Sequence, residues 1–148
     1  MVKVAVVGAS GYAGAQLCRI ISRHEKLELT GLFVSENSLD KGKKISELYG
    51  ELNGLCDKVL QPLIGAKDII DIADAVFLAT DHKVSHDIAP ALVDAGVAVF
   101  DLSGAFRISN TDVFEKAYGF AHEHKDLLKK AVYRSEERRV GKECRSRW

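Results

Sequence analysis

The stretch Val4-Ala5-Val6-Val7-Gly8-Ala9-Ser10-Gly11-Tyr12-Ala13-Gly14 decides the fold of this chain. Its first four residues are apolar and mostly β-branched, which is typical of a buried strand, and they lead into a glycine-rich turn. Beyond the turn, residues recur at helical spacing, namely Ala13, Leu17, Ile20, Ile21 and His24. This spacing predicts an amphipathic helix, so the stretch indicates a strand, a tight turn and a helix in succession.

The three glycines of the turn indicate a binding site for a phosphate group. Because glycine has no Cβ, Gly8 and Gly11 allow left-handed backbone angles and let a ligand approach the backbone, and Gly14 lets the helix pack close to the strand. Free N–H groups and the positive end of the helix dipole then face outward, as a pyrophosphate requires. The Gly-x-x-Gly-x-x-Gly spacing differs from the commoner Gly-x-Gly-x-x-Gly fingerprint, and the alternative is a tight connection that binds nothing.

The composition favours one soluble domain without nucleic-acid or membrane partners. The 148 residues carry 21 basic and 21 acidic side chains, so no basic surface for nucleic acid is expected. The chain has neither a signal peptide pattern nor an apolar run near membrane length, and we expect a cytoplasmic protein. Three cysteines, Cys18, Cys56 and Cys144, lack Cys-x-x-Cys spacing, so neither a disulfide nor a zinc site is predicted, and Cys18 is expected to pack in the core.

Strand-like and helix-like segments alternate along the rest of the chain. Further strands are predicted at Leu27–Val34, Val59–Leu63, Ala75–Ala79 and Val97–Asp101, and a helix capped by Ser85 should run to about Ala95. This alternation predicts the α/β class, with a Rossmann-like, doubly wound parallel sheet. Ligands bind such sheets at the carboxyl ends of the strands, where the glycine turn and three further loops should converge.

The residues after the second strand favour NADP over NAD. An NAD site usually has a carboxylate at this strand exit, but here the exit residue is Ser35. Ser35, Asn37 and Ser38, with Lys41, Lys43 and Lys44 close by, suit a 2′-phosphate. A shift of one residue in the strand end would instead place Glu36 there, as in an NAD site, and an ordinary polar loop is a further alternative.

Other candidate residues follow the later strands. Arg107 comes after a strand exit, where a guanidinium can bind a phosphate or a carboxylate, the alternative being a surface ion pair. His82 and His86 stand four residues apart and could share a helix face, but no third metal ligand is evident and no metal is predicted. His122 and His124 are expected to be solvated.

Three motifs together resemble the N-terminal domain of the N-acetyl-γ-glutamyl-phosphate reductase family. They are Val7-Gly8-Ala9-Ser10-Gly11-Tyr12-Ala13-Gly14, Ala79-Thr80-Asp81-His82-Lys83-Val84-Ser85-His86 and Phe100-Asp101-Leu102-Ser103-Gly104-Ala105-Phe106-Arg107. The resemblance covers residues 2–133. It implies a homo-oligomeric oxidoreductase of arginine biosynthesis, similar to aspartate-semialdehyde dehydrogenase, that uses NADPH to reduce N-acetyl-glutamyl phosphate to the semialdehyde.

The resemblance also implies roles for matching residues. Ser10, Gly11, Tyr12 and Ala13 would cradle the pyrophosphate, Ser35 and Ser38 would face the 2′-phosphate, and Thr80 and Ser103 would line the nicotinamide side. Arg107 would help to hold the acyl phosphate of the substrate. The thiol nucleophile and the histidine acid/base of the family belong to a second domain beyond the matched segment, so no catalytic residue is assigned here.

The sequence changes character at Arg134. Residues 1–133 are expected to form the dinucleotide-binding domain, and residues 134–148 resemble translated adapter DNA, so we interpret them as a non-native tail; a natural basic tail is the alternative. The sequence therefore predicts an inactive fragment of the reductase that binds NADPH. The competing hypotheses are a stand-alone nucleotide-binding or regulatory module without catalysis, and a different Rossmann reductase.

Overall fold

A computed structural model of the chain describes residues 1–132. The chain divides into two compact units, Met1–Ala105 and the segment that begins at Phe106. The prediction of one domain over residues 1–133 and of a separate tail stays a prediction, since the tail lies outside the described residues. No helix in the described part of the chain is long and apolar enough to cross a membrane.

The first unit is built on a five-stranded sheet in which all paired strands are parallel. Its strands are β1 (Val2–Val7), β2 (Leu27–Ser35), β3 (Gln61–Leu63), β4 (Ala75–Leu78) and β5 (Ala98–Asp101). Their order is β3-β2-β1-β4-β5, so β1 lies at the centre. This arrangement confirms the predicted α/β class with a Rossmann-like, doubly wound sheet.

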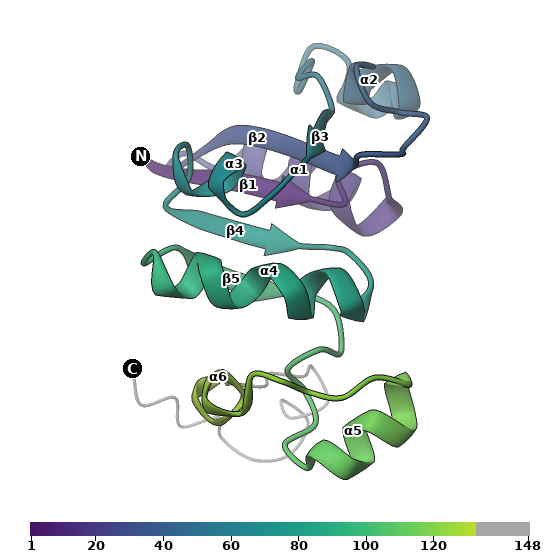
Figure 1. The fold of residues 1–148 in the computed structure, drawn as a ribbon. Coiled ribbons are helices and arrows are strands. Elements are labelled where there is room, and N and C mark those ends of the chain that lie inside the picture. Colours follow the sequence, from purple (N-terminus) through teal and green to yellow (C-terminus); the bar gives the residue numbers. More distant parts are fainter. Residues whose placement is uncertain (133–148) are drawn as a thin grey trace, which may run out of the picture. The chain divides into compact units, whose positions relative to one another are not determined.

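Helices cover both faces of this sheet. They are α1 (Tyr12–Ser22), α2 (Ile45–Leu48), the 3₁₀ helix η1 (Gly50–Leu52), α3 (Lys67–Ile70) and α4 (His82–Asp94). Figure 1 shows α1 behind the sheet, with α3 and α4 in front of it. The strand order explains the two faces: the chain moves outward from β1 to β3 and then returns to β4, and right-handed crossovers in opposite directions place their helices on opposite faces.

The long connection between β2 and β3 supplies part of the core. Its side chains Ile45, Leu52, Cys56 and Leu60 are at most 5% exposed, and they belong to the same apolar cluster as Cys18 of α1. A connection of this length is uncommon in a compact domain. Here it is a packed layer over α1 and not a solvated loop.

The predicted amphipathic helix is confirmed as α1, but part of its buried face differs from the expected one, and the predicted N-cap of α4 is wrong. In α1 the buried residues are Gly14, Ala15, Cys18 and Ile21, whereas Ile20 is 58% exposed. The expected face is rotated because α1 turns its small residues inward, where it approaches the turn closely. In α4 the N-cap is Asp81, whose carboxylate accepts from the Val84 N–H at 3.0 Å; Ser85 lies inside the helix and is buried.

The second unit contains α5 (Thr111–Tyr118) and α6 (Lys125–Lys130). The Asn110 side chain caps α5, and Gly119 ends it with φ = 78°. Phe114 of α5 is fully buried and lies edge-on to His122, with ring centroids 4.8 Å apart. His122 is 3% exposed, so the prediction that it is solvated is wrong: aromatic residues close together in sequence gather around its ring.

Candidate functional site

The glycine turn joins β1 to α1 at the carboxyl edge of the sheet. Gly8 has φ = 78°, and a Cβ atom built on it would lie 2.2 Å from the carbonyl oxygen of Ala79. The N–H groups of Gly8 and Ala9 both donate to the carbonyl of Phe33, at 2.8 and 3.1 Å. The exits of β1, β2 and β4 therefore meet at Gly8, and the predicted left-handed conformation is confirmed there.

Gly14 and Gly11 serve different purposes. A Cβ on Gly14 would lie 2.2 Å from the carbonyl oxygen of Gly8 and 2.7 Å from the Ala9 Cα, so only glycine lets α1 pack this close to the turn. Gly11 has φ = −78° and ψ = 163°, an extended conformation that any residue adopts. The prediction of a left-handed Gly11 is wrong, because between residues 8 and 14 only Gly8 has a positive φ.

The turn and the start of α1 leave four amide groups available to a ligand. The Gly11 N–H is used within the turn, where it donates to the Gly8 carbonyl at 3.1 Å. Within residues 1–132, the N–H groups of Ser10, Tyr12, Ala13 and Gly14 donate to no other atom of the chain. Unsatisfied amides at a helix start, together with the helix dipole, attract an anion. This geometry suits a pyrophosphate.

The exit of β2 forms a second polar region. Ser35 ends the strand, and the Ser38 N–H donates to its carbonyl at 2.9 Å, so a tight turn joins the two serines. The Ser38 Oγ accepts from the Asp40 N–H at 3.2 Å and keeps its own proton to donate. Both predicted serines therefore lie on one turn at the carboxyl edge of the sheet.

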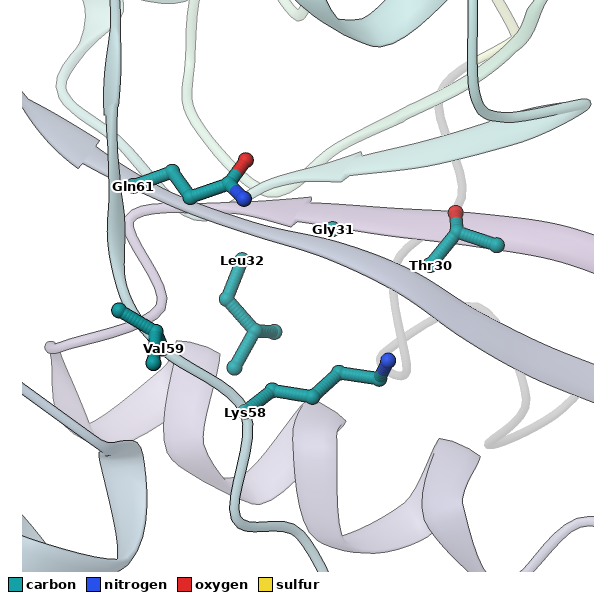
Figure 2. A pocket seen from close by; sticks show the side chains of 6 residues that line it. All are labelled: Thr30, Gly31, Leu32, Lys58, Val59 and Gln61. Carbon is teal, nitrogen blue, oxygen red and sulfur yellow. The ribbon is translucent and has the colours of Figure 1, made fainter.

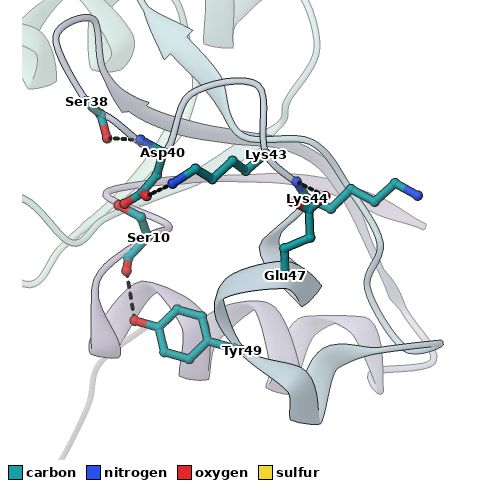
Figure 3. A network of polar contacts seen from close by, with 7 residues as sticks. All are labelled: Ser10, Ser38, Asp40, Lys43, Lys44, Glu47 and Tyr49. Atoms are coloured by element: carbon teal, nitrogen blue, oxygen red, sulfur yellow. Dashed lines mark hydrogen bonds and ion pairs between the residues drawn. The ribbon is translucent and has the colours of Figure 1, made fainter.

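The three lysines of this region are not equivalent. The ammonium of Lys41 donates to the Glu36 carbonyl at 3.0 Å and so lies at the strand exit. Lys43 forms an ion pair of 2.9 Å with Asp40. Figure 3 shows the Lys44 side chain pointing away from Ser10 and Ser38. Of the three, Lys41 offers its charge closest to the strand exit.

The exits of β4 and β5 carry the other two predicted cofactor contacts. The hydroxyls of Thr80 and Ser85 are 3.0 Å apart, and the Ser103 hydroxyl donates to Asp101 at 2.9 Å. The Gly104 N–H donates to Nδ1 of His82 at 2.8 Å and joins the β5 exit to the start of α4. Thus Thr80 and Ser103 both follow strands that end at the same edge as β1.

The two histidines of α4, His82 and His86, form hydrogen bonds within the fold. His82 accepts from Gly104, as described, and His86 is 1% exposed with its ring 3.1 Å from the Asp87 carboxylate. Within residues 1–132, no group of three His, Cys, Asp or Glu side chains could hold a metal ion. The histidine pair stabilises α4 and its contact with the β5 exit.

Arg107 belongs to the second unit, whereas all ten predicted cofactor residues belong to the first. Those ten are Gly8, Ser10, Gly11, Tyr12, Ala13, Gly14, Ser35, Ser38, Thr80 and Ser103. Six of them belong to the glycine turn and the start of α1, and the other four lie at or just after the ends of β2, β4 and β5. The role of each residue, like that of Arg107, stays a prediction.

The described cysteines are poorly suited to nucleophilic chemistry. Cys18 is fully buried, and burial, together with the neighbouring Cys56, raises the pKa of its thiol to about 12. Cys56 is 5% exposed. Since the thiolate is the reactive form, Cys18 offers no nucleophile at neutral pH. Cys144 lies outside the described residues.

A hollow of about 170 Å³ lies beside the middle of β2, away from the carboxyl edge (Figure 2). Its lining residues are Thr30, Gly31, Leu32, Lys58, Val59 and Gln61. The pairing of β1 with β2 skips Thr30, so the strand bulges here. The hollow is too small for a dinucleotide, since ligand pockets usually exceed about 300 Å³.

Sequence reasoning missed one residue at the turn. The Tyr49 hydroxyl donates to the Ser10 carbonyl at 2.8 Å (Figure 3). The Tyr49 ring lies edge-on to that of Tyr12. Tyr49 is 39 residues from Ser10 in the chain. No local pattern indicates this contact, because it depends on how the connection between β2 and β3 folds over α1.

Residues 3–142 match the family described as semialdehyde dehydrogenase, NAD binding domain. Proteins named N-acetyl-gamma-glutamyl-phosphate reductase are similar: that of Aliivibrio fischeri is 50% identical over 133 residues, and that of Moritella abyssi 53% identical over 135. Each alignment covers 90% of this chain. The chain spans about 40% of the length of these relatives.

A solved structure shares the fold. The aspartate semialdehyde dehydrogenase of Candida albicans with NADP superposes with a TM-score of 0.60 at 25% identity, over 75% of this chain and 32% of that one. A probable aspartate-semialdehyde dehydrogenase from Pseudomonas aeruginosa has a TM-score of 0.54 at 25% identity, over 70% of this chain and 28% of that one.

Proposed function

Because the chain belongs to the semialdehyde dehydrogenase NAD-binding domain family, we propose that its first unit binds NADP(H) as the dinucleotide half of an N-acetyl-γ-glutamyl-phosphate reductase. The observation that carries this proposal is the set of unsatisfied amides at Ser10, Tyr12, Ala13 and Gly14. They surround the start of α1, where a pyrophosphate would accept from them. Relatives with the name of this reductase support the choice within the family.

The β2 exit sets the choice between NADP and NAD. The Ser35 and Ser38 hydroxyls and the Lys41 ammonium would bind the 2′-phosphate, and the Candida albicans relative was solved with NADP. Glu36 follows the strand, yet its carbonyl already accepts from Lys41, which brings a positive charge to the exit. Thr80 and Ser103 would line the nicotinamide side of the site.

The reaction itself requires groups beyond those described. When bound, NADPH would supply the hydride that reduces the acyl group of N-acetyl-glutamyl phosphate to the semialdehyde. The chain's own residues would hold the dinucleotide, and Arg107 would bind the phosphate of the substrate. Since Cys18 and Cys56 are buried, we expect this chain alone to bind NADPH without turnover. The full-length protein would be a cytoplasmic homo-oligomer.

Titration of residues 1–148 with NADPH and with NADH, followed by cofactor fluorescence, tests the proposal. We expect NADPH to bind more tightly than NADH, and Cys18→Ala to bind NADPH as the wild type does. Absence of NADPH binding would refute the proposal. A stand-alone module would bind as well, so the gene should also be read across the codons for Tyr133 and Arg134: a frame that continues into a second domain favours the reductase.

A further inference from the structure

The contact between Tyr49 and Ser10 holds one peptide group of the turn at both ends. The Ser10 carbonyl accepts from the Tyr49 hydroxyl at 2.8 Å, and the N–H of the next residue, Gly11, donates to the Gly8 carbonyl at 3.1 Å. This peptide lies directly before the first amides of α1. Figure 3 shows the Tyr49 hydroxyl at this peptide. The orientation of the peptide therefore decides the direction in which the Ser10–Gly14 segment presents its N–H groups.

Tyr49 is held firmly enough to fix that orientation. It lies between α2 and η1, and the neighbouring side chains Ile45 and Leu52 are both 0% exposed. Its ring also meets the Tyr12 ring at 6.3 Å and an angle of 70°. The hydroxyl donor is thus anchored to the core of the first unit through its own segment.

We propose that Tyr49 is a positioning residue for the pyrophosphate of a bound dinucleotide, an inference that rests on the proposed function. A carbonyl oxygen is partially negative and repels an anion, so a Ser10 carbonyl committed to Tyr49 cannot turn toward the phosphates. A turn held in one conformation also loses less entropy on binding. Tyr49 acts through the backbone of the turn and does not itself contact the ligand.

The test separates the pyrophosphate from the 2′-phosphate. ADP-ribose carries the pyrophosphate without the 2′-phosphate, and adenosine 2′-monophosphate carries the 2′-phosphate without the pyrophosphate. In Tyr49→Phe, which keeps the ring, we expect NADPH and ADP-ribose to bind about 3- to 10-fold more weakly, as for one lost hydrogen bond. Adenosine 2′-monophosphate should bind as it does to the wild type.

Glu51→Ala is the matched control. Glu51 lies on the same connection and accepts from Gln16 of α1 at 3.4 Å, and within residues 1–132 its side chain forms no hydrogen bond with the turn. This variant should bind all three ligands normally. Isothermal titration calorimetry of each variant, after circular dichroism has shown that it is folded, supplies the comparison.

Three results would overturn the inference: unchanged binding of ADP-ribose to Tyr49→Phe, an equal loss for adenosine 2′-monophosphate, or a Tyr49→Phe chain that does not fold. The last two would make the hydroxyl generally structural. A wild-type chain that binds neither NADPH nor ADP-ribose would refute the proposed function, and the inference with it. If the wild-type chain binds NADPH and ADP-ribose and one of these three results is found, the inference fails and the proposed function stands.

Discussion

Replacing Gly11 by valine should weaken dinucleotide binding strongly while leaving the fold intact. Gly11 is exposed, with an extended backbone that suits a β-branched residue, and a Cβ there would meet only the Gly8 carbonyl oxygen, at 3.4 Å. We therefore expect the free energy of unfolding to fall by about 1 kcal/mol or less, chiefly because valine is a poor N-cap.

The effect on binding should be much larger. The valine side chain would occupy space beside the free amides of Tyr12 and Ala13, which a pyrophosphate must approach. Each hydrogen bond to a charged group is worth about 1.5–3 kcal/mol. Loss of two such bonds should weaken NADPH binding by about 100-fold or more.

Substitutions at two other glycines serve as comparisons. A Cβ at Gly14 would lie 2.2 Å from a backbone oxygen, so Gly14→Ala should lose about 1–3 kcal/mol of stability from overpacking, partly offset by about 1 kcal/mol of helix propensity. A Cβ at Gly50 would have no atom within 4 Å, so Gly50→Ala should change neither property. Urea unfolding and fluorescence titration measure both quantities. Gly11→Val with wild-type NADPH affinity would refute the site as described.

Three further predictions follow from single contacts. Lys41→Ala should weaken NADPH binding by about 10-fold and leave NADH binding unchanged, which parallel titrations check; an equal loss for both cofactors would contradict a 2′-phosphate contact. Because the pKa of Cys18 rises from 9.0 to about 12 on folding, its contribution to stability is complete below pH 9 and is lost as the pH rises toward 12, and Cys18→Ala should reduce this alkaline decline in urea unfolding. Asp81→Ala removes the N-cap of α4 and should cost about 1 kcal/mol in the same assay; an unchanged midpoint would argue against the cap.

The sequence alone was sufficient to predict properties that depend on residues close together in the chain. The alternation of β-branched runs with helical spacing indicated the parallel sheet, and the position of Gly8 between a strand and a helix indicated the left-handed turn that the structure shows. The end of β2 was located to within one residue: the strand includes Ser35, so that Glu36 is the first residue after it. These features follow from the backbone preferences of single residues and from the spacing of apolar residues along the chain, both of which can be read from the sequence.

Other properties of the site depend on residues that are distant in sequence. Gly11 and Gly14 are the same residue type three positions apart, yet a Cβ would lie 2.2 Å from the Gly8 carbonyl oxygen at Gly14 and 3.4 Å from it at Gly11. Asp81, and not Ser85, caps α4 because the helix begins one turn earlier than the pattern indicates. The different roles of these residues result from packing against segments that are distant in sequence.

By itself, the sequence determined the class of the fold, the alternation of strands and helices in its sheet and the edge of the sheet at which the candidate site is expected. Only the tertiary structure decided which amides of the turn stay free, which lysine lies at the β2 exit, and that Tyr49 holds the Ser10 carbonyl. The physical reason is that strand and helix preferences are local, whereas hydrogen bonds between segments 39 residues apart exist only after the chain has packed.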